Sequence, residues 1–357
     1  MTKSIAAGRT RAWVDIDLDA LARNAQRFQA HMQRPLLPMV KADGYGLGAE
    51  AVAHALEPLS PWGYGVATVE EAATLRRAGI GRPILLFTPL YPQILHACLT
   101  WGLRPSIGDP AMLGLWLESG GKAFHLAVDT GMGRSGVPWH DAEAWAQLHP
   151  MLADQPAFEG MYSHLHSAGD DPDASAVQMA RFQAVIDALP RRPEFLHIAN
   201  SAADPSMALD LVRPGIHLYG GPVAGVAGEP VVKLQARVVA VRRVRPGDTV
   251  SYGATWQAAL PTTIATIAIG YADGLHRALS GTGRVELRDT VCPIAGLVTM
   301  DLTMVDVGDL PVQVGNVATV FGGRVSLEDQ AARAGTIPYE LLTAMGPRLP
   351  RLYRRTA

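Results

Sequence analysis

Short apolar runs alternate with longer amphipathic stretches from about residue 12 to residue 220. This alternation is typical of repeated strand and helix units that surround a parallel sheet. Eight such units favour a (β/α)8 TIM barrel, a fold of the α/β class. The apolar runs lie near Leu36–Val40, Gly63–Ala67, Ile84–Thr88, Arg104–Ile107, Phe124–Val128, Met161–His164, Phe195–Ile198 and Leu211–Arg213.

One of these units carries clear boundary signals for a helix. Thr68 is followed by Glu71 at the spacing of a capping box, in which each residue hydrogen-bonds the backbone beside the other. Ala78-Gly79 then supplies the glycine that commonly ends a helix. The sequence therefore predicts a helix between these two signals, followed by the next strand.

The later part of the chain follows a different pattern. The stretch from about Val231 to Gly323 is rich in valine, isoleucine and threonine, which favour strands. Turn sequences such as Arg245-Pro246-Gly247-Asp248 and Val314-Gly315-Asn316 interrupt this stretch. We therefore expect a mostly β domain after the barrel.

The length of the chain also favours two domains, because 357 residues exceed what one hydrophobic core usually supports. Glycine and proline dominate residues 220–228, where no apolar period is visible. We place a barrel domain at 12–225 and a mostly β C-terminal domain at 226–357. The N-terminal segment 1–15 can pack with the second domain.

Composition narrows the class of protein. The 31 Lys and Arg and 33 Asp and Glu give a net charge of −2, which supplies no cationic field for nucleic acid or a membrane surface. No apolar run approaches the roughly 20 residues of a membrane span, and residues 1–11 lack the apolar part of a secretory signal. The two cysteines, Cys98 and Cys292, form no disulfide framework, so we expect a cytoplasmic protein.

Lys41 directly follows the first apolar run, and active sites of TIM barrels lie at the carboxyl ends of the strands. The glycine-rich stretch Ala42–Gly46 after it can let a ligand approach the backbone. Partial desolvation there would disfavour the ammonium form, as a Schiff-base lysine requires. Taken alone, a lysine at a strand end more often extends to solvent.

Other reactive side chains also follow apolar runs. Arg134 lies past the fifth run among glycines, His164 closes the sixth, and Asn200-Ser201 follow the seventh. Each alone also fits a surface loop. Because loops after the seventh and eighth strands of barrels commonly bind phosphate, Ser201, Gly215 and Ile216 form a candidate phosphate site.

A metal site is not expected. His164 and His166 stand near Asp170 and Asp171, and alternation along a strand would place both histidines on one face. No third ligand can be assigned to them.

Six motifs in order resemble the alanine racemases, which are pyridoxal 5′-phosphate (PLP) enzymes of fold type III. The resemblance covers nearly the whole chain. The motifs are Val40–Gly46, Asp129–Arg134, His197–Ala203, Val250–Thr255, Ile269–Gly274 and Met300-Asp301.

The resemblance implies a two-base racemisation of alanine. Lys41 would bind PLP covalently and act as one base, while Tyr252 would reach the opposite face of the substrate α-carbon from the partner subunit of a homodimer. Tyrosine has a pKa of about 10, so it needs surroundings that favour the phenolate. His164 and Arg213 match family residues that provide them.

The resemblance also assigns other contacts. Arg213 would face the pyridine nitrogen and, because arginine keeps its proton, leave the ring unprotonated. Arg134 would meet the phenolic oxygen of PLP and the substrate carboxylate. The other assignments are Tyr45, Ser201, Gly215 and Ile216 to the phosphate, Asn200 to the cofactor, Met300 to the carboxylate site and Tyr271 to the substrate entryway.

The chain departs from the family pattern at three places. Ala127 stands where many members carry a carbamylated lysine that pairs with the motif arginine, so water, a side chain or chloride must offset the charge of Arg134. Leu297 replaces an arginine before Met300-Asp301. The stretch Ala344–Arg348 lacks a tyrosine that some members present to the phosphate.

Several alternatives stay open. The departures leave room for a broad-specificity or serine racemase on the same scaffold. A PLP-dependent decarboxylase is disfavoured because its C-terminal cysteine and glycine motifs are missing. A non-catalytic PLP-binding homeostasis protein would resemble the barrel alone. The physiological role, D-alanine supply for peptidoglycan or L-alanine supply for catabolism, is not decided.

Overall fold

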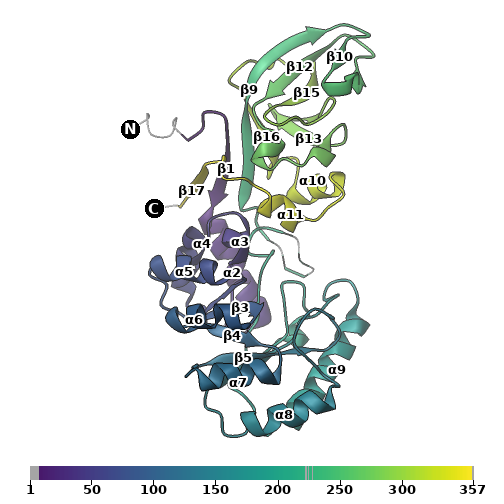
Figure 1. Cartoon of the computed structure of the whole chain (residues 1–357). Coiled ribbons are helices and arrows are strands. Elements are labelled where there is room, and N and C mark those ends of the chain that lie inside the picture. Colours follow the sequence, from purple (N-terminus) through teal and green to yellow (C-terminus); the bar gives the residue numbers. More distant parts are fainter. Residues whose placement is uncertain (1–7, 222, 224, 227, 356–357) are drawn as a thin grey trace.

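The computed structural model describes residues 8–221, 223, 225–226 and 228–355. Two regions built on separate sheets follow each other along the molecule (Figure 1). The first contains a parallel sheet whose neighbouring strands are, in order, β2 (Tyr64–Val66), β3 (Ile84–Pro89), β4 (Arg104–Ile107), β5 (Phe124–Asp129), β7 (Phe158–Tyr162) and β8 (Phe195–His197).

The first and eighth predicted runs close this sheet without forming long strands. Met39 bridges to Gly65 on one side, and Leu36 bridges to Val212 on the other. Arg213 in turn bridges to Asn200. All three bridges are parallel, so the six strands and two bridged segments form a ring. The predicted α/β class and barrel architecture are therefore confirmed.

One predicted strand is displaced along the chain. The apolar run near Met161–His164 forms the end of β7, which begins at Phe158 and ends at Tyr162. The apolar pattern did not reveal the start of this strand, because Glu159 and Gly160 interrupt it. Ser163 and His164 consequently lie beyond the strand, at its carboxyl end. A two-residue strand, β6 (Val137–Pro138), also pairs with β5 and was not predicted.

Helices cover the outside of the barrel sheet (Figure 1). The predicted capping box on α5 is present, since Glu71 N–H donates to Thr68 Oγ1 at 3.2 Å and Thr68 N–H donates to Glu71 at 3.3 Å. Gly79 follows the helix with a φ of 85°, a left-handed conformation that favours glycine. The helices are α2 (Leu18–Met32), α4 (Ala49–Leu56), α5 (Val69–Arg77), α6 (Pro92–Thr100), α7 (Pro110–Glu118), α8 (Ala142–Leu152) and α9 (Pro172–Ala188).

The second region is mostly β, as expected. Its long strand β9 (Val232–Val244) pairs with three neighbours, β1, β12 and β16. The other strands of this sheet are β1 (Ala12–Asp17), β12 (Thr262–Ile267), β13 (Arg284–Leu287), β14 (Thr290–Pro293), β15 (Thr303–Gly308), β16 (Val317–Phe321) and β17 (Arg351–Arg354). A separate pair is formed by β10 (Thr249–Val250) and β11 (Trp256–Gln257).

The two ends of the described chain meet in the second sheet. Strand β1 lies between β9 and β17, and it pairs antiparallel with β9 and parallel with β17 (Figure 1). The helices α10 (Leu327–Arg333) and α11 (Pro338–Thr343) turn back from this sheet toward the barrel. The limits 12–225 and 226–357 stay a prediction, although β1 belongs to the β sheet.

A buried carboxylate joins three distant parts of the β region. Asp273 is fully buried and accepts hydrogen bonds from Arg11 Nη1 at 2.7 Å and Arg11 Nη2 at 2.6 Å. Arg348 Nε lies 3.2 Å from the same carboxylate, and Gly270 N–H donates to it at 3.0 Å. Asp273 thereby fixes the short 3-10 helix η4 (Tyr271–Asp273), which carries Tyr271.

We predict that Asp273→Asn lowers the free energy of unfolding by about 3 kcal/mol, because two arginines lose a buried partner. Urea unfolding followed by circular dichroism checks this value. Asp289→Asn is the control: Asp289 is exposed, and asparagine tolerates its left-handed φ of 59°. A loss below about 0.5 kcal/mol in both variants would contradict the structural role of Asp273.

Candidate active site

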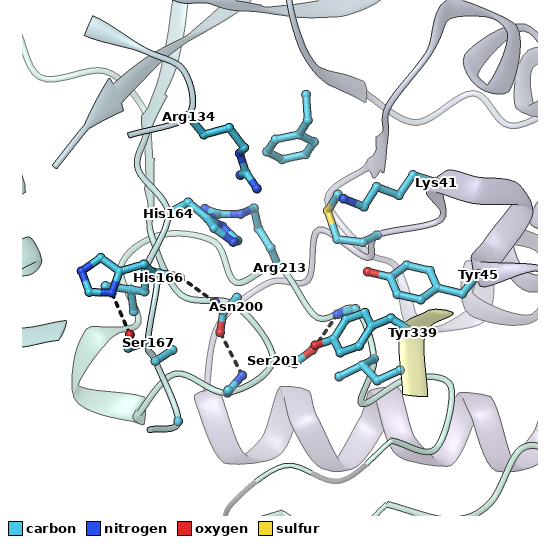
Figure 2. A pocket seen from close by; sticks show the side chains of 18 of the residues that line it. Lys41, Tyr45, Arg134, His164, His166, Ser167, Asn200, Ser201, Arg213 and Tyr339 are labelled. Atoms are coloured by element: carbon cyan, nitrogen blue, oxygen red, sulfur yellow. Dashed lines mark hydrogen bonds between the residues drawn. The ribbon is translucent and has the colours of Figure 1, made fainter. Parts of the chain in front are cut away.

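A cavity of about 510 Å³ lies at the carboxyl ends of the barrel strands. Its wall comes from loops far apart in the sequence and from α11 of the β region (Figure 2). Nine of the residues predicted for the site line this cavity: Lys41, Tyr45, Arg134, His164, Asn200, Ser201, Arg213, Gly215 and Ile216.

Lys41 begins a short left-handed turn, α3 (Lys41–Tyr45). Ala42 and Asp43 adopt φ values of 52° and 53°, which are unusual for residues with a Cβ. Two carboxylates hold this turn, since Ala42 N–H donates to Glu71 at 2.7 Å and Asp43 accepts from Ala49 N–H at 2.8 Å. The same glutamate that caps α5 therefore also braces the lysine. Strained backbone of this kind concentrates at functional sites.

The surroundings of Lys41 favour its neutral amine. Burial lowers the pKa of Lys41, and the positive charges of Arg134 and Arg213 lower it further. Glu71 opposes this change but does not outweigh it. A neutral amine can act as a nucleophile or accept a proton, whereas an ammonium group can do neither.

Arg213 is a buried cation that lines the cavity and is held by several hydrogen bonds. Its Nη1 donates to His197 Nδ1 at 2.8 Å, and its Nη2 lies 3.2 Å from His164 Nδ1. Nη2 also donates to the carbonyl of Ser163 at 2.7 Å and to that of Ile198 at 3.0 Å. Burial lowers the pKa of Arg213 to about 10, so the side chain stays protonated at neutral pH.

Arg213 sets the protonation of His164. A guanidinium group only donates hydrogen bonds, so Nδ1 of His164 must be bare, and a neutral ring then carries its proton on Nε2. Burial, followed by the charge of Arg213, lowers the pKa of His164 to about 3. His164 is therefore a neutral donor at the edge of the cavity.

The four residues predicted to hold the phosphate, Tyr45, Ser201, Gly215 and Ile216, all line the cavity. Ser201 Oγ accepts from Gly215 N–H at 2.7 Å. A Cβ on Gly215 would lie 2.5 Å from the hydroxyl oxygen of Tyr45, so only glycine lets the backbone approach that hydroxyl. The Tyr45 ring stacks on Tyr219 with centroids 4.4 Å apart. The hydroxyls of Ser201 and Tyr45 thus both lie close to the Gly215 backbone, and binding of a phosphate there stays a prediction.

Asn200 supports a loop in this structure. Its side-chain oxygen accepts from Ala202 N–H at 2.9 Å, and its amide nitrogen lies 3.5 Å from the carbonyl of Leu165. These bonds brace the segment that carries Ser201. A direct contact between Asn200 and the cofactor stays a prediction.

Arg134 stands beside a second cavity, which Ala127 also lines. This cavity has a volume of about 340 Å³ and is lined by Lys41, Ala127 and Arg134. Asp129 is near in sequence, but its carboxylate accepts from Gly131 and Gly133 N–H within its own loop. Among the described residues, none forms an ion pair with Arg134.

Three predicted site residues lie elsewhere in the β region. The side chains of Tyr252, Met300 and Tyr271 are 73%, 53% and 43% exposed, and none of them lines the cavity. Leu297 lies near Tyr252, since its carbonyl accepts from Ser251 Oγ at 2.9 Å. The described part of one chain thus brings Lys41 together with the residues predicted to hold the phosphate, but not with the predicted second base.

The structure adds aromatic residues that were not predicted from the sequence, among them Phe87 and Tyr339. Tyr339 of α11 lines the cavity, and its ring centroid is 6.0 Å from that of Tyr45 (Figure 2). The position of Tyr339 at the start of a helix, directly after Pro338, was the available signal, but it did not reveal which way the helix points.

The two histidines considered for a metal site have separate partners. His164 Nδ1 faces Arg213, whereas His166 Nδ1 lies 2.8 Å from Ser167 Oγ. Both residues follow the end of β7, so the strand alternation used to place them on one face does not apply. Within the described ranges, no group of three His, Cys, Asp or Glu side chains is arranged to hold a metal ion.

Known proteins resemble the chain over nearly its full length. The family description "Alanine racemase, N-terminal domain" matches residues 16–222, and "Alanine racemase, C-terminal domain" matches residues 231–353. An alanine racemase of Sorangium cellulosum is 37% identical over 97% of this chain and 99% of its own. One of Deinococcus radiodurans is 39% identical over 96% of this chain and 98% of its own.

Solved structures give the same picture. An alanine racemase of Clostridium difficile superposes with a TM-score of 0.90 at 28% identity, covering 97% of this chain and 96% of that one. An enzyme of Bartonella henselae with covalently bound pyridoxal phosphate gives a TM-score of 0.89 at 30% identity, covering 97% and 100%. The C-terminal match disfavours a barrel-only homeostasis protein. The chain therefore belongs to the alanine racemase family, whose members are PLP-dependent isomerases.

Proposed function

We propose that this protein interconverts L-alanine and D-alanine with PLP by a two-base mechanism, in which Lys41 and Tyr252 are the bases. The observation that carries this proposal is the position of Lys41. Its amine is partly buried and has a lowered pKa, and it shares one cavity with Arg213 and with the candidate phosphate site of Tyr45, Ser201, Gly215 and Ile216. This combination suits a cofactor that has both an aldehyde and a phosphate.

The residues present fit PLP. Lys41 would hold its aldehyde carbon, and Tyr45, Ser201, Gly215 and Ile216 would hold its phosphate. PLP supplies an electron sink for the charge left on the substrate α-carbon when its proton departs. Arg213 would face the pyridine nitrogen and keep its own proton there, which leaves the ring a weaker sink and discourages transamination.

Two groups of the protein would move the proton. Neutral Lys41 would accept it on one face of the α-carbon, and Tyr252 would serve the opposite face, which makes inversion possible. His164 supports this role for Tyr252, because Arg213 fixes the histidine proton on Nε2, from where it can donate to a phenolate. Arg134 would orient the substrate by its carboxylate.

The second base requires a second chain. Tyr252, Met300 and Tyr271 are exposed and away from the cavity of their own chain. Exposed apolar groups such as Leu260 and Leu302 belong to the same region, and such groups commonly mark interfaces. We therefore propose a head-to-tail homodimer in which the partner subunit's Tyr252 and the partner's Met300 complete each site, with the partner's Tyr271 at the entryway.

We place this enzyme in the cytoplasm, where it would supply D-alanine for peptidoglycan or L-alanine for catabolism. A neighbour from Pseudomonas aeruginosa, with a TM-score of 0.88, is described as a biosynthetic alanine racemase. No helix among the described residues is long and apolar enough to cross a membrane. A broad-specificity or serine racemase is the alternative, since the cavity beside Ala127 leaves additional room near Arg134.

We further propose that a small anion such as chloride occupies the cavity beside Ala127 and offsets the charge of Arg134. Replacing chloride by gluconate at constant ionic strength should then raise KM for alanine about tenfold, through loss of one charge-assisted contact. Steady-state kinetics measure this effect. The variant Ala127→Asp carries its own carboxylate and should be indifferent to the exchange. Equal KM values of the unaltered enzyme in both salts would remove chloride as the occupant.

The role of Tyr252 can be separated from cofactor binding. Tyr252→Phe should reduce racemisation at least about 100-fold, the range of a lost general acid or base, and PLP binding should persist. In deuterated water this variant should still exchange the α-proton of one enantiomer through Lys41. Tyr91→Phe changes another exposed tyrosine and should have no effect. Exchange of both enantiomers by Tyr252→Phe would show that Tyr252 is not the second base.

Sharing of the site between subunits predicts complementation. Lys41→Ala and Tyr252→Phe should each be inactive, but random mixing after reversible dissociation should restore about a quarter of the sites in a symmetric dimer. Each mixed dimer would combine intact Lys41 of one chain with intact Tyr252 of the other. Activity of the mixture measures this directly. No recovery despite mixed dimers seen by native mass spectrometry would place both bases in the same chain.

A further inference from the structure

A chain of buried polar side chains runs through the barrel interior, away from the cavity. Arg213 Nη1 donates to His197 Nδ1 at 2.8 Å, and His197 Nε2 lies 2.8 Å from His125 Nδ1. His125 Nε2 then lies 3.3 Å from Glu159 Oε2. His197 ends β8 near the cavity, whereas Glu159 is the second residue of β7, at the opposite end of the barrel.

Donor and acceptor chemistry fixes every proton in this chain. Arg213 only donates, so His197 Nδ1 is bare and its proton is on Nε2. That proton points at His125 Nδ1, which must also be bare, so His125 carries its proton on Nε2. The proton of His125 then requires an acceptor, and the carboxylate of Glu159 is the one present. One assignment satisfies all three contacts.

The surroundings keep both histidines neutral and Glu159 ionised. Burial lowers the pKa of His125 and that of His197, and both rings are fully buried. Burial raises the pKa of Glu159, but hydrogen bonds from His125 and Arg104 outweigh this effect and leave it below its ordinary value. Arg104 donates from Nε to Oε2 at 3.1 Å and from Nη2 to Oε1 at 3.2 Å.

The rings are also fixed in position. Tyr162 stacks on His197 with centroids 5.1 Å apart and an angle of 14°, and Trp62 lies 5.4 Å from His125. A Cβ on Gly160 would lie 2.4 Å from the His125 ring, so glycine beside Glu159 makes room for this histidine. Because the two rings cannot move, the position of the proton on each ring is what can still change in this hydrogen-bonded chain.

We infer that Glu159 is a positioning residue that fixes the tautomers of His125 and His197 and thereby holds Arg213 in place for the cofactor ring. Without this acceptor, His125 can carry its proton on Nδ1 and donate to His197 Nε2. His197 then carries its proton on Nδ1 and presents a donor to Arg213, which is itself a donor. Arg213 Nη1 then loses its acceptor, while Nη2 keeps the carbonyls of Ser163 and Ile198. The link to the cofactor rests on the proposed function, whereas the tautomers do not.

The test is nitrogen NMR of the PLP-loaded enzyme labelled with ¹⁵N at histidine, because a ring nitrogen that carries a proton has a shift different from that of a bare one. In the unaltered enzyme, His125 and His197 should both have a protonated Nε2 and a bare Nδ1. Glu159→Met removes the acceptor at similar size, and His197 should then show a protonated Nδ1. A protonated Nδ1 on either histidine of the unaltered enzyme would overturn the inference, whether or not the variant folds.

Two controls separate positioning from general disruption of this end of the barrel. Arg104→Met leaves the carboxylate of Glu159 in place and should keep both tautomers. Glu194→Met changes an exposed glutamate that lines the same opening as Glu159 and should change nothing. A spectrum of Glu159→Met identical to that of the unaltered enzyme, or an Arg104→Met spectrum with the same tautomer change, would refute the inference.

A functional readout follows from the same variants. With Arg213 Nη1 left without its acceptor, Glu159→Met should form pyruvate from alanine about tenfold more often per racemisation event, a change that corresponds to one hydrogen bond. An altered tautomer with an unchanged pyruvate ratio would refute the link to Arg213. If the unaltered enzyme does not racemise alanine, the proposed function is wrong. The assignment of the histidine tautomers is then still tested by the NMR spectrum alone.

Discussion

Closure of the barrel between its first and last segments is the constraint on which the site depends. Met39 N–H donates to the carbonyl of Pro214 at 2.9 Å, and Leu37 N–H donates to that of Val212 at 2.8 Å. These bonds place Lys41 beside Arg213, although the two lie far apart in the sequence. The lowered pKa of the lysine follows from this arrangement, since burial and nearby arginines both act on it.

Arg213 then organises the side chains around it, because a guanidinium group offers only donors. It fixes the proton of His164 at the cavity and, together with Glu159 at the other end of the chain, that of His197 behind it. Burial lowers the pKa of Arg213 only to about 10, so its side chain stays positively charged at neutral pH. The barrel interior below the cavity is thus polar and ordered, and Glu159 is the anion at its far end.

Much of the fold could be predicted from the sequence because its signals are local. Apolar runs located the barrel segments, and the Thr68 and Glu71 pair located a helix start. Lys41 and Arg134 could be proposed because each follows such a run. Glu159 was missed because it lies inside a strand, at the end opposite the cavity. Nothing in the sequence near Tyr339 shows that α11 turns toward the barrel, since tertiary packing decides that direction.

The most direct test of the account measures the racemisation of many amino acids in one reaction. Purified protein loaded with PLP would be incubated with an equimolar mixture of L-amino acids in deuterated water, and each enantiomer followed by chiral chromatography with mass detection. The account predicts D-alanine almost alone, with deuterium at its α-carbon. Several D-amino acids would instead support the broad-specificity alternative. No D-amino acid from a protein that stays yellow with bound cofactor would contradict the two-base assignment of Lys41 and Tyr252.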